Sequence, residues 1–234
     1  MPDPRLRPRR WQATYAVRAP LVRWLGEQAR GVHEQLGGPY RLLDVGCGQK
    51  PYEPLFAPYV SEYVGVDPVE NPRAELRGPV EALPVADGSF DVVLCSQVLE
   101  HADDPARAVR ELFRVLRPGG RLLLSTHGTF VYHLSPADYW RWTHAGLEKV
   151  LRDNGEWASV TVTPASGTTA CLAMLVSLYV SLAARRARVG ALALPAIATL
   201  NTLAEAIDGA VPSLRRPGPG TLFANLHALA VKPG

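Results

Sequence analysis

Apolar runs and amphipathic stretches alternate along most of the chain. Short runs rich in branched and aromatic residues predict buried strands, and apolar residues at steps of three and four predict helices. The last strand is expected after a long second apolar region. The pattern predicts helices over residues 11–36, 52–59, 105–116 and 143–154, and strands over residues 40–45, 63–67, 90–95, 121–126, 157–163 and 223–232.

The first predicted strand ends at an acid and is followed by a glycine turn. Asp44 lies near the end of the strand, and Gly46 and Gly48 allow a tight turn against which a ligand could lie. A phosphate-binding loop needs a third glycine three residues later, and Pro51 occupies that position. The turn therefore suits a ligand with a cationic group and a hydroxylated sugar better than a pyrophosphate.

A second strand ends on another acid, Asp67. In a strand–helix–strand unit, an acid about 20 residues beyond the glycine turn accepts hydrogen bonds from ribose hydroxyls. A single acid at the end of a strand is usually a helix cap or a turn residue. The pair Asp44 and Asp67, together with the glycine turn, favours a ligand site at the carboxyl edge of the sheet.

Further blocks follow in a fixed order. They are Leu42-Leu43-Asp44-Val45-Gly46-Cys47-Gly48, Val64-Gly65-Val66-Asp67, Glu81-Ala82-Leu83-Pro84 with Asp87-Gly88-Ser89-Phe90-Asp91-Val92-Val93, Val98-Leu99-Glu100-His101, and Leu116-Arg117-Pro118-Gly119-Gly120-Arg121-Leu122. Together they resemble the successive motifs of class I S-adenosylmethionine-dependent methyltransferases, in the large bacterial group acting on small molecules and glycans. The resemblance covers about residues 40–163.

This resemblance implies a fold and a cofactor. The fold is α/β, a Rossmann-like doubly wound sheet of seven strands with an antiparallel last strand. The methionine end of S-adenosylmethionine would lie against the turn of Asp44, Gly46, Cys47 and Gly48. Asp67 would take the ribose hydroxyls, the backbone of Val80, Glu81 and Ala82 would meet the adenine, and Ser96 and Gln97 would close the pocket. The family often has a third glycine where this chain has Lys50, and an acid where it has Pro79.

Two histidines are candidate general bases. His127 ends the fifth strand near the expected methyl group, and His101 follows the fourth. A hydrogen-bonded structural histidine is an equally good interpretation for each. The aromatic and polar segment 127–143 follows the carboxyl end of a strand and is expected to cover the pocket, or else to be a packed loop before the next helix.

Composition narrows the function classes. The formal net charge is +3, and four arginines in the first ten residues account for it, so a broad nucleic-acid-binding face is not expected. This basic arm could touch anionic lipid or nucleic acid, but a solvated and frayed terminus is the favoured interpretation. The three cysteines are far apart and show neither a disulfide framework nor a metal-ligand spacing. These features, and the absence of a signal-peptide pattern, predict a cytoplasmic protein with no metal site.

The segment before the last strand is unusually apolar. Residues 168–184 and 189–204 carry no charge, and Arg185, Arg186 and Arg188 lie between them. Two helices that cross a membrane are the least favoured interpretation, because both runs are short and the arginines would have to cross. A hairpin lying in the membrane interface and a pair of helices packed on the core, on the acceptor pocket or on a second copy are equally favoured.

The sequence thus predicts one domain over residues 1–234. Its parts are a basic arm and helix (1–39), a cofactor-binding core (40–163), an apolar helical insertion (164–220) and a final strand (221–234). The predicted function is methyl transfer from S-adenosylmethionine to an oxygen or nitrogen of a small-molecule, glycan or lipid-linked acceptor. The expected contacts beyond the acceptor are a peripheral membrane contact or a homodimer through residues 168–204. The alternative is a non-catalytic binding or scaffold protein with the same fold; a nicotinamide dehydrogenase is disfavoured by the missing phosphate loop.

Overall fold

A seven-stranded sheet forms the centre of the molecule, as the resemblance implies. In this computed structural model, which describes residues 3–133 and 137–234, the strand order is β3-β2-β1-β4-β5-β7-β6, and only β7 is antiparallel to its neighbours. The strands are β1 (Tyr40–Val45), β2 (Val60–Asp67), β3 (Leu76–Arg77), β4 (Phe90–Ser96), β5 (Leu116–His127), β6 (Ser159–Pro164) and β7 (Asn225–Val231).

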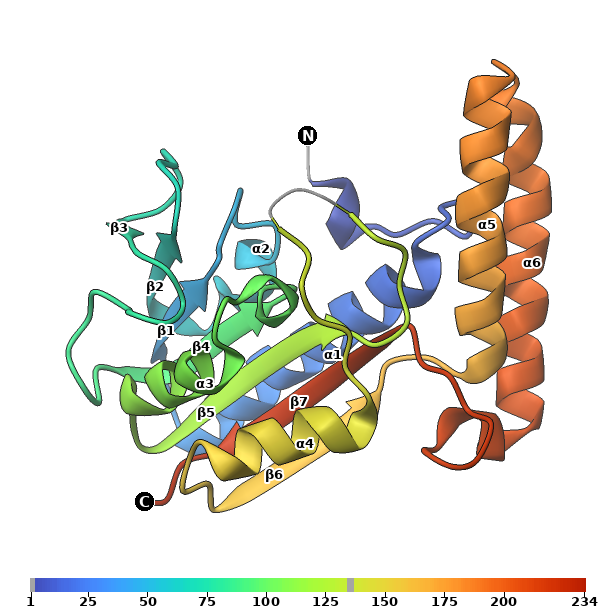
Figure 1. Ribbon diagram of the computed structural model, residues 1–234. Helices are drawn as coiled ribbons and strands as arrows, with labels where there is room; N and C mark the ends of the chain where they lie inside the picture. The colour runs from blue at the N-terminus through green and yellow to red at the C-terminus, as the bar shows by residue number, and fades with distance from the viewer. Residues whose placement is uncertain (1–2, 134–136) are drawn as a thin grey trace.

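Helices cover both faces of this sheet (Figure 1). The α-helices are α1 (Tyr15–Leu36), α2 (Glu53–Phe56), α3 (Pro105–Arg114), α4 (His144–Asp153), α5 (Thr168–Arg186) and α6 (Gly190–Ala210), and the 3-10 turns are η1 (Pro4–Leu6), η2 (Leu99–His101) and η3 (Pro212–Arg215). Successive side chains of a strand point to opposite faces, so Leu42 packs in a cluster with α1 and α2 while Leu43 packs in a larger cluster with α3 and α4. The sheet is therefore doubly wound, as predicted.

Local differences from the sequence prediction have simple causes. The segment 117–120, predicted as a turn between helix and strand, lies within β5 as a bulge: Phe90 pairs with Leu116, and Val92 pairs with Arg121. Gly119 supplies the positive φ that this bulge needs. The two-residue β3 is too short to give a periodic signal, and α1 begins at Tyr15 rather than at residue 11.

The described part of the basic N-terminal arm, residues 3–10, contacts the rest of the protein, whereas a solvated arm was predicted. Asp3 caps η1 by accepting a hydrogen bond from the Arg5 backbone amide at 2.8 Å, and its carboxylate also binds the Arg5 guanidinium. Further along, Arg10 forms an ion pair with Glu205 of α6 at 2.6 Å. The sequence offers no sign of these partners because Glu205 is almost two hundred residues away.

Helices α5 and α6 form an antiparallel pair that stands beside the sheet (Figure 1). The insertion is helical and apolar, as predicted, and both helices are long and apolar enough to cross a membrane. Their lower ends are fixed: Asp208, only 2% exposed, accepts hydrogen bonds from the backbone amides of Thr169 and Ala170 at 3.0 and 2.9 Å. A carboxylate at the start of α5 also complements the partial positive charge of the helix terminus.

We expect Asp208→Ala to destabilise the protein by about 1–2 kcal/mol, because two amides at the N-terminus of α5 lose their acceptor in a buried position. Urea unfolding followed by circular dichroism measures this change, and limited proteolysis is expected to cut between α5 and α6 sooner. Glu27→Ala is the matched control, since Glu27 is an exposed acid of α1. Equal unfolding midpoints for both variants would contradict the role given to Asp208.

Candidate functional site

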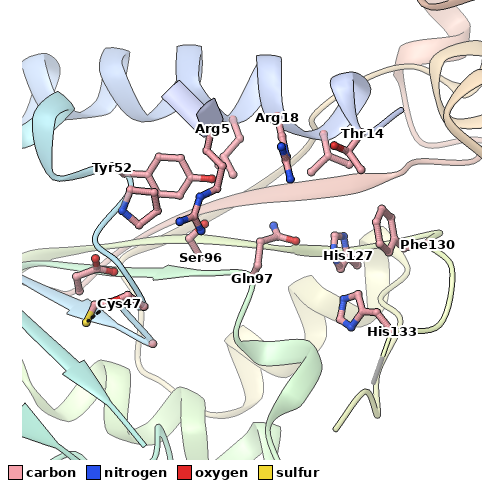
Figure 2. A pocket seen from close by; sticks show the side chains of 16 residues that line it. Arg5, Thr14, Arg18, Cys47, Tyr52, Ser96, Gln97, His127, Phe130 and His133 are labelled. Atoms are coloured by element: carbon pink, nitrogen blue, oxygen red, sulfur yellow. Dashed lines mark hydrogen bonds between the residues drawn. The ribbon is translucent and has the colours of Figure 1, made fainter. Parts of the chain in front are cut away.

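A cavity of about 320 Å³ opens at the carboxyl ends of β1, β4 and β5 (Figure 2). Its floor is made by the loops that leave these strands, and α1 and η1 cover it from above. The predicted residues that line it are Asp44, Gly46, Cys47, Gly48, Ser96, Gln97 and His127. The sheet topology thus brings together side chains from three separate motifs, as expected of a parallel α/β sheet.

The glycine turn after β1 has the geometry that the sequence indicated. Gly46 and Gly48 have φ of 66° and 49°, which side chains rarely adopt. A Cβ on Gly46 would overlap the Val98 side chain, whereas the position of a Cβ on Gly48 is open space. Gly46 is therefore required because the Val98 side chain packs against it, and Gly48 leaves the backbone exposed to a ligand.

Asp44 is a buried carboxylate beside the cavity. It is 3% exposed, and the Tyr63 hydroxyl donates a hydrogen bond to it at 2.7 Å. Burial raises the pKa of Asp44 to about 7, although the Tyr63 hydrogen bond acts in the opposite direction. A cationic ligand stabilises the ionised form of such a buried carboxylate, because the ligand supplies a positive charge that the protein does not place beside it.

Lys50 occupies the position where a third glycine is common, and the structure gives it a partner. Its φ is 50°, its side chain is 3% exposed, and Nζ contacts both carboxylate oxygens of Glu75 at 2.6 and 2.7 Å. Glu75 also accepts a hydrogen bond from the Gly65 amide at 2.6 Å. The pair fastens the turn after β1 to β2 and leaves Lys50 without a role as a cavity residue.

Asp67 lies at the end of β2 and also fixes the glycine turn. Its Oδ2 accepts hydrogen bonds from the Gly48 amide at 3.0 Å and from the Asn71 side chain at 3.2 Å. Asp67 does not line the cavity, so a role in binding ribose hydroxyls stays a prediction.

The segment predicted to meet the adenine also lies outside the cavity. Val80 is buried in the core, and the Glu81 carboxylate accepts hydrogen bonds from the backbone amides of Asp103 and Asp104 at 2.8 and 3.4 Å. Glu81 therefore holds the chain entering α3. Only the backbone of residues 80–82, including Ala82, is left for the predicted contact.

Ser96 and Gln97 come together at the middle of the cavity, between Cys47 at one end and His127 at the other (Figure 2). Ser125 joins them: its hydroxyl lies 2.9 Å from the Ser96 hydroxyl and 2.9 Å from the Gln97 amide nitrogen, which also donates to Asn225 at 3.0 Å. The Gln97 amide oxygen is buried and has no partner among the described residues. It is available to accept a hydrogen bond from a ligand.

Two arginines in the cavity wall were not predicted. Arg5 of η1 and Arg18 of α1 point into the cavity from above, near Tyr52 (Figure 2). Arg5 is paired with Asp3, whereas Arg18 makes no ion pair or hydrogen bond through its side chain to any described residue. The arginine-rich arm was a visible signal, but its position over the cavity depends on the docking of α1 against the sheet.

His127 lies at the far end of the cavity and is 6% exposed. Its ring is stacked on Phe130 at 4.0 Å between centroids, Nε2 is 3.6 Å from the buried carboxylate of Glu100, and Nδ1 has no partner in the described part of the chain. Burial lowers the pKa of His127 to about 3 and raises that of Glu100 to about 7. The pair is therefore a contact between neutral groups when the pH is below 7. Glu100, which sequence analysis missed, ionises near neutrality.

His101 lies outside the cavity, near its end. Its Nδ1 is 2.6 Å from the Ala137 carbonyl oxygen, and one of its ring nitrogens lies within 4.8 Å of ligand atoms of His133 and Asp138. Both oxygens of Asp138 are held by Arg141 at 2.5 Å, so this group has little charge left to offer a metal ion. The residues 134–136, in the predicted covering segment 127–143, lie outside the described residues.

The cavity fits a ligand with a cationic group and an anionic group. Asp44 offers a buried carboxylate at one end, Arg18 adds a positive charge to the cavity wall, and Gln97 and His127 keep polar atoms that have no partner among the described residues. The methionine end of S-adenosylmethionine carries these two charges, an ammonium and a carboxylate, next to a sulfonium. The residues present are therefore suited to that cofactor.

Comparison with known proteins finds matches to the middle of the chain, which supplies the β1 and β4 parts of this site. Residues 43–124 match the model of a family described as a methyltransferase domain. The chain is 38% identical over 104 residues to YcgJ, an uncharacterized methyltransferase of Bacillus subtilis. This alignment covers 38% of this chain and 41% of that protein. A ubiquinone biosynthesis O-methyltransferase of Pseudomonas aeruginosa is 33% identical over 120 residues, 45% of this chain and 49% of that protein. These matches span less than half the length of each relative.

Solved structures share the fold at low identity. The cyclase SpnF superposes with a TM-score of 0.55 and 22% identity, covering 89% of this chain and 80% of its own. The 1,6-didemethyltoxoflavin N1-methyltransferase of Burkholderia thailandensis, solved with 1,6-didemethyltoxoflavin and S-adenosylhomocysteine bound, has a TM-score of 0.51 and 18% identity, covering 90% of this chain and 78% of its own. They establish that the fold is that of class I methyltransferases.

We expect the affinity for S-adenosylmethionine to rise about tenfold per pH unit up to pH 7 and then to level off. Below pH 7 the Asp44 carboxyl is protonated and must lose its proton to pair with a cation, whereas above pH 7 it is already ionised. Isothermal titration calorimetry between pH 5.5 and 8.5 measures this dependence. Asp44→Asn should bind weakly and without this pH dependence, and the same slope in that variant would assign the titration to another group.

Proposed function

Because residues 43–124 match the model of a methyltransferase domain, we propose that this chain transfers a methyl group from S-adenosylmethionine to an oxygen or nitrogen of an acceptor. The observation that carries the proposal is one continuous cavity with a charged end at Asp44 and a histidine end at His127, joined by Ser96 and Gln97. The charged end suits the donor, and the histidine end leaves room for an acceptor next to it.

In this proposal the cofactor supplies a methyl group already activated by a positively charged sulfur, so the protein mainly positions the reactants. Asp44 pairs with the ammonium group, and Arg18 faces the carboxylate. Gln97, whose backbone is held at a φ of 57°, presents its free amide oxygen at the middle of the cavity. These residues fix the donor along the line that ends at His127.

His127 and Glu100 would accept the acceptor's proton together. An imidazole whose pKa is lowered to about 3 by burial is a weak base by itself. The Glu100 carboxylate ionises near pH 7 and lies 3.6 Å from Nε2, so it stabilises the positive charge that appears on the ring when Nδ1 takes the proton. Thr126 keeps Glu100 in place with a hydrogen bond of 2.8 Å.

The acceptor class follows from the space that remains. A cavity of about 320 Å³ that must also hold part of the donor admits only a small reacting group. The stacked rings of His127 and Phe130 favour a flat or apolar group at that end. We therefore propose a small molecule, or the small terminal part of a glycan or lipid-linked molecule, as acceptor, and a cytoplasmic location for the reaction.

A non-catalytic or non-methylating role is the second candidate. SpnF, whose structure this chain resembles, is a cyclase, so the fold is not restricted to methyl transfer. The low pKa of His127 also favours this alternative, because an imidazole of that kind takes up protons poorly. Incubation with labelled S-adenosylmethionine and a cell extract distinguishes the two, since only a methyltransferase moves the label into a product.

We expect His127→Ala to lower kcat at least a hundredfold while the Kd for S-adenosylmethionine changes less than threefold, because proton removal is lost and the donor contacts remain. His101→Ala is the matched control and should keep kcat within a few-fold of the original. Single-turnover kinetics with labelled donor, together with calorimetry, separates the two effects. A comparable loss in both variants, or none in either, would remove His127 from the reaction.

A further inference from the structure

We propose that the outward face of the α5–α6 hairpin docks on an anionic lipid bilayer and lies in its interfacial region. We call this surface the hairpin face. It consists of the exposed apolar side chains Leu172, Val176, Tyr179, Leu192, Leu203 and Ile207. The proposal concerns attachment of the protein and does not depend on the reaction proposed above.

Each helix contributes one exposed apolar stripe. On α5, Leu172, Val176 and Tyr179 are 48%, 50% and 64% exposed, and on α6, Leu192 and Leu203 are 77% and 56% exposed. Their spacings are those of residues on one side of a helix. Neither uncharged run, 168–184 or 189–204, places a charged side chain within these stripes.

The two stripes lie on the same side of the hairpin. The helices meet through Val180 and Ala184 of α5 and Ala193 and Ile197 of α6. An α-helix turns by about 100° per residue, so the exposed stripe of each helix lies roughly 110° around the helix axis from the residues of this contact. The direction of this rotation is the same for both helices when each is viewed along its own chain direction. Because the helices are antiparallel, equal rotations bring both stripes to one face, which is broad enough to rest on a surface.

The opposite face of the hairpin is occupied by the protein itself. The Asn201 side chain donates hydrogen bonds to the backbone oxygens of Arg10 and Gln12 at 2.7 and 3.1 Å, and Glu205 pairs with Arg10. Near the lower ends, Met174 packs with Val17 of α1. The core thus fixes the orientation of the hairpin and leaves the hairpin face turned outward.

The positive charge at the free end of the hairpin indicates which kind of surface the hairpin face binds. Arg185, Arg186 and Arg188 are exposed at the turn between the helices, and none of them forms an ion pair with a described residue. An apolar face next to three free arginines complements the acyl chains and the anionic headgroups of a bilayer interface. A second copy packed hairpin to hairpin offers these arginines no free acid, because the two acids of the hairpin, Glu205 and Asp208, are already engaged.

Docking in the interface fits the structure better than crossing the membrane. The lower halves of both helices contact the core, so only the upper part could enter a bilayer lengthwise, and the arginines would enter first. In Figure 1 the free end of the hairpin lies on the same side of the molecule as η1, which supplies Arg5 to the cavity wall. Docking would therefore bring the cavity close to the lipid surface.

Flotation of the full chain with vesicles tests the proposal. We expect binding to vesicles of phosphatidylcholine with phosphatidylglycerol and little binding to phosphatidylcholine alone. The triple variant R185Q/R186Q/R188Q should weaken binding about a hundredfold, since each arginine near an anionic surface contributes about fivefold. The triple variant R23Q/R215Q/R216Q removes the same charge from other exposed positions and should bind within a few-fold of the original chain.

The apolar face is tested separately. L192Q/L203Q should abolish flotation, whereas V69Q/L36Q, which changes two exposed apolar residues elsewhere, should not. Circular dichroism and calorimetry with S-adenosylmethionine establish that each variant is folded. Absence of flotation of the original chain, equal losses in both triple variants, or light scattering that shows a dimer disrupted by L192Q/L203Q in the absence of flotation would overturn the proposal.

Discussion

A carboxylate withdrawn from water at the end of β1 is the constraint on which the rest of the site depends. Among the residues that the structure describes, Asp44 has one hydrogen-bond donor, the Tyr63 hydroxyl, where an ionised carboxylate could accept several. Burial of this kind is unfavourable for the charged form, and folding tolerates it because the turn around it is fixed by other contacts: Gly48 to Asp67, and Lys50 to Glu75. The Asp44 carboxylate is thereby kept available for a ligand cation, and the binding of that cation recovers part of the free energy lost when the carboxylate was buried.

The sequence predicted the sheet well because its strands are covered on both faces and are therefore uniformly apolar. Leu42, Leu43, Val92 and Val93 are all completely buried, so periodicity was hardly needed to recognise them. The antiparallel last strand came from the motif resemblance, and the order of the strands was not predicted, since pairing between distant segments leaves no local trace. The bulge at 117–120 was predicted as a turn because proline and glycine occur in turns and in bulges alike, so the sequence does not distinguish the two.

The site was only partly predictable, for a related reason. Asp44, Gly46 and Gly48 follow a strand and carry a local signal, whereas Arg18 belongs to an amphipathic helix in which an arginine normally faces water. Glu100 appeared to be one polar residue of a motif. It is completely buried: Thr126 donates a hydrogen bond to its carboxylate, and the backbone amides of Tyr139 and Trp140 from a distant loop donate to its backbone oxygen. Contacts between segments far apart in the chain decide both roles.

The connection between β6 and β7 has a consequence for how such proteins diversify. The two strands are antiparallel neighbours, and Pro164 pairs directly with Leu226 where the helical excursion leaves and rejoins the sheet. Because its two ends are already held together, the excursion can lengthen, shorten or be exchanged at a small entropic cost and without shifting any strand. Insertions at this position could therefore change where related proteins are located in the cell without changing the reaction that their shared fold supports.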